Sequence, residues 1–223
     1  MTILAFDTVT TVFSVALTTP AGFWYSEVDS GLKHESLILT VAESLLNLAH
    51  IHVQTLEAVA CVQGPGSFTG IRIGFATAQG IARALNIPLK TAPTLDCMAY
   101  GAQGWPGYVV PSIDAKTHKY FSALYRDGQR LSPYCDIAAA GIAQWFEGSE
   151  KILLTGPGAD LLYADLKPLV DSQRMVLDPH RRRGIAPALS MLAQESPIEP
   201  LYVRNALSSV NEIQNISKKG EEH

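Results

Sequence analysis

The chain has 223 residues, of which 47% are hydrophobic, and a formal net charge of −4 at pH 7. This composition excludes a disordered chain, no apolar run reaches the roughly 18 residues of a membrane span, and the acidic balance argues against strong nucleic-acid binding by the chain alone. The charges are uneven, because residues 1–110 carry 7 acids and 4 bases whereas residues 111–223 carry 14 acids and 13 bases.

The first hundred residues predict alternating strands and helices. Short apolar runs rich in β-branched and aromatic residues indicate strands, and longer stretches without proline, dominated by helix formers, indicate helices. The expected elements are, in chain order, strands over 3–6, 13–17 and 23–28, a helix over 34–49, a strand over 58–62, a helix over 69–85, a strand over 89–92 and a helix over 94–102.

The rest of the chain predicts the same order again. The expected elements are strands over 108–113, 120–125 and 130–136, a helix over 137–146, a strand over 152–155, and helices over 159–166 and 185–195. An aspartate, Asp7 or Asp114, ends the first strand of each copy, and a Gly-Pro-Gly turn, 64–66 or 156–158, ends the fourth. Coincidence is the alternative, because these are ordinary loop residues.

A duplicated βββαβα unit is the plan of the actin-like, Hsp70 and sugar-kinase (ASKHA) superfold. The expected fold class is therefore α/β with two similar lobes. We expect a first, partner-binding lobe over 1–103 and a second, diverged lobe with a C-terminal tail over 104–223. Three widely spaced cysteines and an opening without a basic segment predict reduced thiols in a cytoplasmic protein.

The strand ends and glycine-rich turns are candidates for facing a nucleotide phosphate. A glycine-rich turn between a strand and a helix can aim backbone N–H groups at an anion, although this one lacks the lysine of a P-loop. A purely structural role as turns is the alternative, since Asp and Thr often bond their own backbone. The candidates are Asp7, Thr8, Gly64, Gly66, Ser67, Thr69, Gly70, Asp114, Gly156 and Gly158.

The helix over 34–49 carries more apolar surface than one sheet can cover. At 100° per residue its apolar side chains fill an arc of roughly 200°, about twice the stripe that packing on a sheet requires. The excess is buried either by a partner subunit or within the same chain. The interface candidates are Leu37, Ile38, Val41, Leu45, Leu46 and Leu48. An aspartate at Leu45 or Leu46 is expected to leave the lobe folded and to weaken association.

The next helix, over 69–85, predicts close packing of its backbone. Small residues recur every four positions at Gly70, Gly74, Ala78 and Ala82, and each glycine in a helix costs about 1 kcal/mol relative to alanine unless packing compensates. No metal-ligand spacing and no Ser/His/Asp order is evident in the sequence. We therefore expect no catalytic residue and no metal. The enzyme alternative is an actin-like ATPase or kinase that uses Asp7, Asp114 and both Gly-Pro-Gly turns.

The segment Gly64-Pro65-Gly66-Ser67-Phe68-Thr69-Gly70-Ile71-Arg72-Ile73-Gly74 resembles the hallmark of the bacterial TsaB (YeaZ) family. The resemblance extends to the opening at 3–8, to 113–115 and to 200–204. Two segments depart from the family pattern, since Glu35-Ser36 stands where the family has Ser-Glu, and Lys116 stands where it has arginine.

This resemblance implies a cytoplasmic, non-catalytic subunit of the complex that adds threonylcarbamoyl to N6 of adenosine 37 in tRNAs reading ANN codons. It implies a TsaD-like catalytic partner, a TsaE-like ATPase, a homodimer in isolation, and contact with tRNA only through the complex. It also implies that ATP or ADP binds at the partner junction and that first-lobe helices form that junction, with His34, Glu35 and Arg72 among the contacts. A peptidase activity has no support in these residues.

Overall fold

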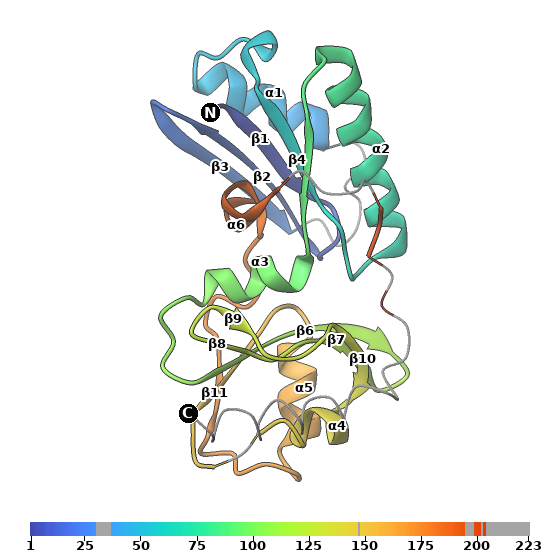
Figure 1. The fold of residues 1–223 in the computed structure, drawn as a ribbon, viewed down its shortest axis with the longest axis vertical. Coiled ribbons are helices and arrows are strands. Elements are labelled where there is room, and N and C mark those ends of the chain that lie inside the picture. The colour runs from blue at the N-terminus through green and yellow to red at the C-terminus, as the bar shows by residue number, and fades with distance from the viewer. Residues whose placement is uncertain (30–36, 147, 195–198, 202, 204–223) are drawn as a thin grey trace, which may run out of the picture. The chain divides into compact units, whose positions relative to one another are not determined.

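The structure is a computed structural model that describes residues 1–29, 37–146, 148–194, 199–201 and 203. The chain divides into two compact units, which are described separately (Figure 1). Unit 1 comprises Met1–Cys97 together with Arg183–Tyr202, and unit 2 is built around Met98–Arg182. Within the described ranges, no helix has both the length and the apolar character needed to cross a membrane.

Unit 1 is a five-stranded sheet with helices on both faces. Its strands lie in the order β3-β2-β1-β4-β5, with β1, β4 and β5 parallel and β2 and β3 antiparallel to their neighbours. Every residue of β1 and β4 is buried, as expected for central strands covered on both faces. The strands are β1 (Ile3–Asp7), β2 (Val12–Thr19), β3 (Gly22–Asp29), β4 (Ala58–Val62) and β5 (Leu89–Ala92).

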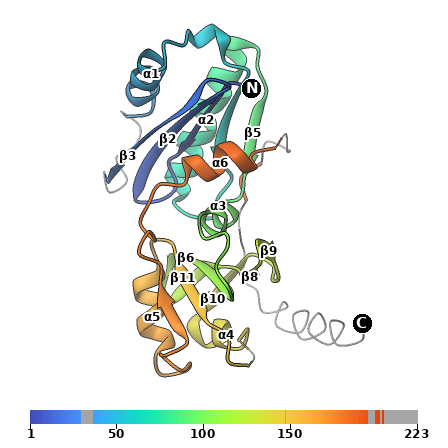
Figure 2. The same ribbon diagram turned by 90° about the vertical axis from the view of Figure 1, so that its left-hand side faces the viewer.

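Three helices cover this sheet. Two of them, α1 (Ile38–Leu48) and α2 (Phe68–Leu85), lie on one face, and α6 (Ala186–Leu192) crosses the other (Figures 1 and 2). A short 3₁₀ turn, Val53–Thr55, links α1 to β4, and α3 (Thr94–Gly101) follows β5. The carboxyl ends of β1 and β4 therefore meet the loop that precedes α2, where the phosphate-facing candidates of the first copy lie.

Unit 2 repeats the strand order of unit 1. Its main path is β10-β7-β6-β11-β12, again with three parallel strands followed outward by antiparallel ones. This correspondence confirms the predicted duplication and the ASKHA-like fold class. The elements are β6 (Tyr108–Lys116), β7 (Lys119–Ser122), β8 (Tyr125–Arg126), β9 (Gln129–Arg130), β10 (Cys135–Ala138), α4 (Ala139–Ala143), β11 (Ile152–Thr155), α5 (Ala159–Leu166) and β12 (Met175–Leu177).

The unit boundaries differ from the predicted lobes 1–103 and 104–223. The first stretch of unit 1 ends at Cys97, and Arg183–Tyr202, predicted in the second lobe, belongs to unit 1. The reason is that α6 packs on β1 and β2. The backbone N–H of Ala186 donates to Ser14 Oγ at 3.1 Å, and Thr18 Oγ1 donates to Ser190 Oγ, also at 3.1 Å.

A cluster around Gly184 fixes the chain where it returns to unit 1. The Gly184 N–H donates to Glu27 Oε2 at 2.9 Å, and the Tyr25 hydroxyl bonds both Glu27 and the Gly184 carbonyl. A Cβ at Gly184 would lie 2.3 Å from Ser14 Cβ, so the position requires glycine. Burial and the Glu27 hydrogen bond raise the pKa of Tyr25 far above its usual range, and Tyr25 therefore stays a donor.

Three predicted elements of unit 2 are wrong in part. The strand expected over 120–125 is divided into β7 and β8, the one expected over 130–136 is divided into β9 and β10, and the helix that follows begins later than expected. A helix was expected from Ile137, but Ile137 and Ala138 complete β10 and pair with Tyr120 and Lys119 of β7. Sheet pairing outweighs helix propensity at the β-branched Ile137, so the helix is limited to Ala139–Ala143. β12 was not predicted, because its three residues are too short to show a period of their own.

Two arginines from the segment after β12 pair with the first turn of α5. Arg181 donates to both carboxylate oxygens of Asp160, at 2.8 and 3.0 Å, and Arg182 adds a third bond at 3.1 Å. These bonds, led by that of Arg181, lower the pKa of Asp160. A carboxyl group whose pKa is lower when folded stabilises the protein above its unfolded pKa and loses that contribution as pH falls.

Asp160→Asn is therefore expected to lower the free energy of unfolding at pH 7 by about 1 kcal/mol or less, because the pair is partly exposed. The difference from wild type should shrink as pH falls below about 4, the usual carboxyl pKa, and urea unfolding at several pH values measures it. Asp127→Asn, at an exposed turn position with φ +51°, serves as the control. A pH-independent difference would contradict the assignment.

Candidate functional site

The carboxylate of Asp7 is buried and engaged by its own turn. Its Oδ1 accepts the N–H groups of Val9 and Thr10 at 2.7 and 3.4 Å, and its Oδ2 accepts the Thr10 hydroxyl at 2.5 Å. The residue has no exposed surface. Asp7 thus stabilises the β1–β2 turn by hydrogen bonds to nearby backbone groups, as short polar side chains often do. This is the structural role that the sequence offered as the alternative to phosphate contact.

Asp114 repeats this turn at the end of the corresponding part of β6. Its Oδ1 accepts the N–H of Lys116 at 2.8 Å, and its Oδ2 pairs with Lys116 Nζ at 3.1 Å. Partial desolvation opposes ionisation, but the two Lys116 bonds prevail and lower the pKa of Asp114. Unlike Asp7, its side chain is about one third exposed (34%). The correspondence of the two aspartates predicted from the sequence thus extends to their hydrogen bonds.

The loop over 64–70 is joined to two other segments of unit 1. The Ser67 N–H donates to the Val9 carbonyl at 3.3 Å, and the Thr94 N–H donates to the Gly64 carbonyl at 2.8 Å. Ser67 Oγ accepts the Gly70 N–H at 3.1 Å and so caps α2. Gly64 and Gly66 adopt φ values of +99° and +148°, which explains why glycine stands at both positions.

Thr8 lies directly against the first turns of α2. Its hydroxyl donates to the Gly70 carbonyl at 2.7 Å. A Cβ at Gly70 would lie 2.0 Å from the Thr8 carbonyl oxygen, and one at Gly74 would lie 2.6 Å from Thr8 Oγ1. The close packing predicted for the row Gly70, Gly74, Ala78 and Ala82 is therefore confirmed, and all four residues are buried.

The second Gly-Pro-Gly turn packs against β6. The Gly158 N–H donates to the Ser112 carbonyl at 2.9 Å. A Cβ at Gly158 would lie 2.9 Å from the Asp114 nitrogen, and one at Gly156, where φ is +87°, would lie 2.6 Å from the Ser112 oxygen. Glycine is needed at both positions because the turn lies so close to the backbone of β6 that a Cβ would clash with it.

The start of α2 presents one exposed aromatic and one exposed cation. The Arg72 guanidinium lies 4.0 Å from the centroid of the Phe68 ring, a cation–π contact, and 51% of the Phe68 surface is exposed. Thr69, between them, is also exposed. Of the first-copy candidates for phosphate contact, Thr69 is thus the one that lies open at the surface.

The apolar arc of α1 divides into a buried stripe and two exposed flanks. Ile38, Ala42, Leu45 and Leu46 are buried, and at 100° per residue they span a stripe of roughly 100°. Leu48 and Leu39, one on each flank, are 67% and 63% exposed. His34 and Glu35 lie outside the described residues.

This burial corrects the choice of variants made from the sequence. Leu45 and Leu46 are only 4% and 8% exposed within unit 1, so an aspartate there would place a charge in the core rather than on an interface. Leu37 and Val41 are half-buried and share a flank with Leu48. The side chains open to a partner are therefore those of this flank and Leu39.

The described residues include no group of three His, Cys, Asp or Glu side chains placed to hold a metal ion. All three cysteines are free and buried. Burial raises the pKa of Cys61 to about 12 and that of Cys97 well above its usual value, so these thiols stay protonated and unreactive near neutral pH.

Comparisons with known proteins find a family model, curated relatives and solved structures that resemble this chain. The model of the TsaD family, tRNA N6-adenosine threonylcarbamoyltransferase, matches residues 29–156. The tRNA threonylcarbamoyladenosine biosynthesis proteins TsaB of Escherichia coli and Bacillus subtilis are 36% and 32% identical over 132 and 128 residues. A YeaZ structure from Pseudomonas aeruginosa covers 91% of this chain and 99% of its own, with a TM-score of 0.72 and 23% identity.

The chain belongs to the TsaB (YeaZ) family.

The match to the TsaB relatives is partial in length. The aligned part covers 56% of this chain and 55–56% of the E. coli and B. subtilis proteins, so the chain spans about half the length of the curated relatives it matches. An uncharacterized protein of Mycobacterium tuberculosis is 30% identical over 177 residues, 79% of this chain and 77% of that protein. A second P. aeruginosa structure, of a protein with similarity to peptidase YEAZ, has a TM-score of 0.77 and 24% identity.

Sequence reasoning missed one surface of this TsaB-family chain. Ala76, Gly80 and Ala84 form a second row of small residues along the exposed side of α2, and a Cβ at Gly80 would meet nothing within 4 Å. The spacing of four was visible in the sequence. Both rows share that spacing, so only the structure shows which one packs on the sheet.

Proposed function

We propose that this chain is a non-catalytic scaffold subunit in N6-threonylcarbamoyladenosine biosynthesis, and that α1 and α2 dock a TsaD-like catalytic subunit. The names of the TsaB relatives support the pathway. The observation that carries the docking is the apolar flank of α1, on which Leu37, Val41 and Leu48 recur at spacings of four and seven. At 3.6 residues per turn these side chains form one stripe, and no described element of unit 1 covers Leu48.

The exposed side of α2 supports the same role. The row Ala76, Gly80 and Ala84 has no bulky side chain, and helices pack at interaxial distances of about 8–10 Å that depend on the side chains at the contact. A partner helix can therefore approach this row closely. An apolar stripe on one helix and a flat row on the other suit a partner that presents helices of its own.

The hydrogen bonds at the predicted site favour a scaffold over an actin-like ATPase or kinase. In an enzyme of that kind the Asp7 carboxylate would face the nucleotide, but here it accepts hydrogen bonds from the Val9 N–H and the Thr10 hydroxyl. The Gly158 N–H, a possible donor to a phosphate, donates to the Ser112 carbonyl instead. A TsaE-like ATPase as a further partner, a homodimer in isolation, ATP or ADP at the partner junction, and tRNA contact through the complex alone stay predictions.

Leu48→Asp tests the docking. The variant should fold, because Leu48 is 67% exposed, and it should weaken association with the TsaD-family subunit at least about tenfold, since a charge in an apolar contact must lose its water. Titration calorimetry with the purified partner measures this affinity.

The matched control is Asn47→Asp, which adds the same charge one residue earlier, at an exposed polar position. It should bind like wild type. If Leu48→Asp is folded and binds the partner with wild-type affinity, the α1 flank is not the docking surface. Reconstituted modification of tRNA with each variant reports whether docking is needed for activity.

A further inference from the structure

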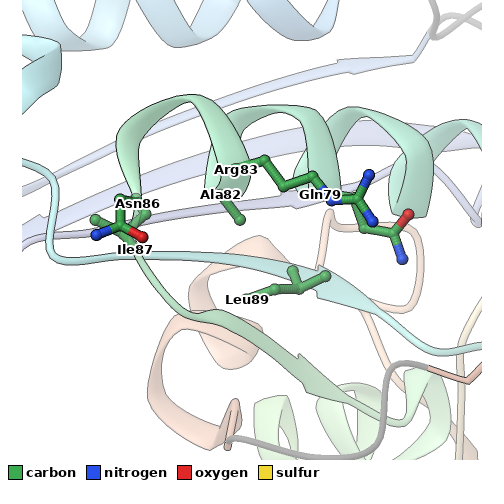
Figure 3. A pocket seen from close by; sticks show the side chains of 6 residues that line it. All are labelled: Gln79, Ala82, Arg83, Asn86, Ile87 and Leu89. Atoms are coloured by element: carbon green, nitrogen blue, oxygen red, sulfur yellow. The ribbon is translucent and has the colours of Figure 1, made fainter.

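The far end of α2 forms one wall of a small hollow in unit 1. The hollow has a volume of about 270 Å³ and lies between the last two turns of α2 and the segment that enters β5 (Figure 3). It is lined by Gln79, Ala82, Arg83, Asn86, Ile87 and Leu89. Ligand pockets for drug-sized molecules are about 300–1,000 Å³, so this one suits a smaller ligand.

The hollow has an apolar side and a polar side. Ala82 and Leu89 are each 8% exposed and Ile87 is half-buried. Gln79, Arg83 and Asn86 follow at spacings of four and three on one side of α2, and all three line the hollow (Figure 3). A guanidinium and two amides thus border an apolar surface.

These three polar side chains have no partner within the described part of the chain. The hydrogen bonds at this end of α2 join backbone groups. The Ile87 N–H donates to the Ala82 carbonyl at 3.0 Å, and the Asn86 N–H donates to the Arg83 carbonyl at 3.4 Å. Asn86 is held at φ +54° by this cap. The cap occupies two of the helix-end carbonyls, those of Ala82 and Arg83, so it lessens the repulsion of an anion by the negative end of the helix without removing it. Among the described residues, no carboxylate pairs with Arg83, which carries the positive charge of the hollow.

We propose that this hollow binds a small monocarboxylic acid with a short aliphatic chain. The planar Arg83 guanidinium matches a carboxylate with two parallel hydrogen bonds, and the Gln79 and Asn86 amides supply further donors. The aliphatic chain packs on Ala82, Ile87 and Leu89. The site lies on unit 1 alone, so binding does not depend on the proposed TsaD-like partner.

Butyrate is the probe, titrated into the full-length chain while backbone amide signals are followed by NMR. Saturable shifts are expected in residues 79–89, with a dissociation constant near 1 mM, a value typical of few contacts. Arg83→Gln should weaken binding at least about tenfold. Arg183→Gln removes the same charge at an exposed position elsewhere in unit 1 and should bind like wild type.

Three results would overturn the proposal. The first is the absence of saturable shifts in the wild-type chain, and the second is equal affinity in folded Arg83→Gln. The third is equal binding of n-propylamine, which has the same propyl chain as butyrate and the opposite charge. Circular dichroism of each variant confirms that it is folded. Because no partner is present in this experiment, its failure would leave the docking proposal unaffected. Failure of the docking proposal would likewise leave the proposed ligand site unaffected.

Discussion

Gly70→Ala is expected to lower the free energy of unfolding of unit 1 by about 3 kcal/mol, at the upper end of the usual cost of overpacking. The added Cβ would lie 2.0 Å from the Thr8 carbonyl oxygen, a backbone atom that cannot rotate away. Either α2 or the β1–β2 turn must shift, and the hydrogen bond from Thr8 Oγ1 to the Gly70 carbonyl is lost with the shift. Urea unfolding of the full chain measures the change.

Gly80→Ala is the matched control for this variant. The residue lies in the same helix, and its added Cβ would meet nothing within 4 Å. Alanine should therefore stabilise the helix by about 1 kcal/mol through its higher propensity. If the two variants were equally stable, α2 would have to move away from Thr8 without cost, and the account of the small-residue row would fail.

Leu45→Asp is expected to destabilise unit 1 by about 4 kcal/mol or more, because it removes a buried leucine and places a carboxylate where it has no partner. Leu45 is 4% exposed, on the stripe of α1 that faces the sheet. This loss approaches the whole stability of many domains, which is about 5–15 kcal/mol.

The thermal unfolding midpoint of the variant measures this effect. Leu48→Asp, with the same substitution three residues later at a 67% exposed position, should change stability by less than about 1 kcal/mol. The two variants therefore separate folding from association. Equal midpoints for Leu45→Asp and wild type would show that α1 is not packed as described.

Most of the fold could be predicted because its signals are local. The fully buried strands β1 and β4 read as short apolar runs, and the duplication was visible from Asp7, Asp114 and the two Gly-Pro-Gly turns. The assignment of α6 to unit 1 could not be predicted, because it depends on contacts with Ser14 and Thr18 about 170 residues earlier in the chain.

The burial and contacts of the candidate site residues could not be predicted from the sequence. An apolar arc of known width does not say which part of it faces the sheet, so Leu45 could not be told from Leu48. Likewise Gly70 and Gly80 are residues of the same type in one helix. Only the structure shows that Gly70 packs against Thr8 and that Gly80 does not. The hollow beside Arg83 depends on the left-handed Asn86, a backbone turn that no periodic pattern reveals.

Unit 1 is built from two separate stretches of the chain, and this affects how it folds during synthesis. Its sheet is complete at Ala92, but α6, which covers one face of that sheet, lies beyond the whole of Met98–Arg182. At about 5–20 residues per second, a ribosome needs roughly 5 to 20 seconds to pass from the last strand to the end of α6. Unit 2 can therefore fold during translation while the nascent first sheet still has one bare apolar face, which is the period when chaperones would bind it.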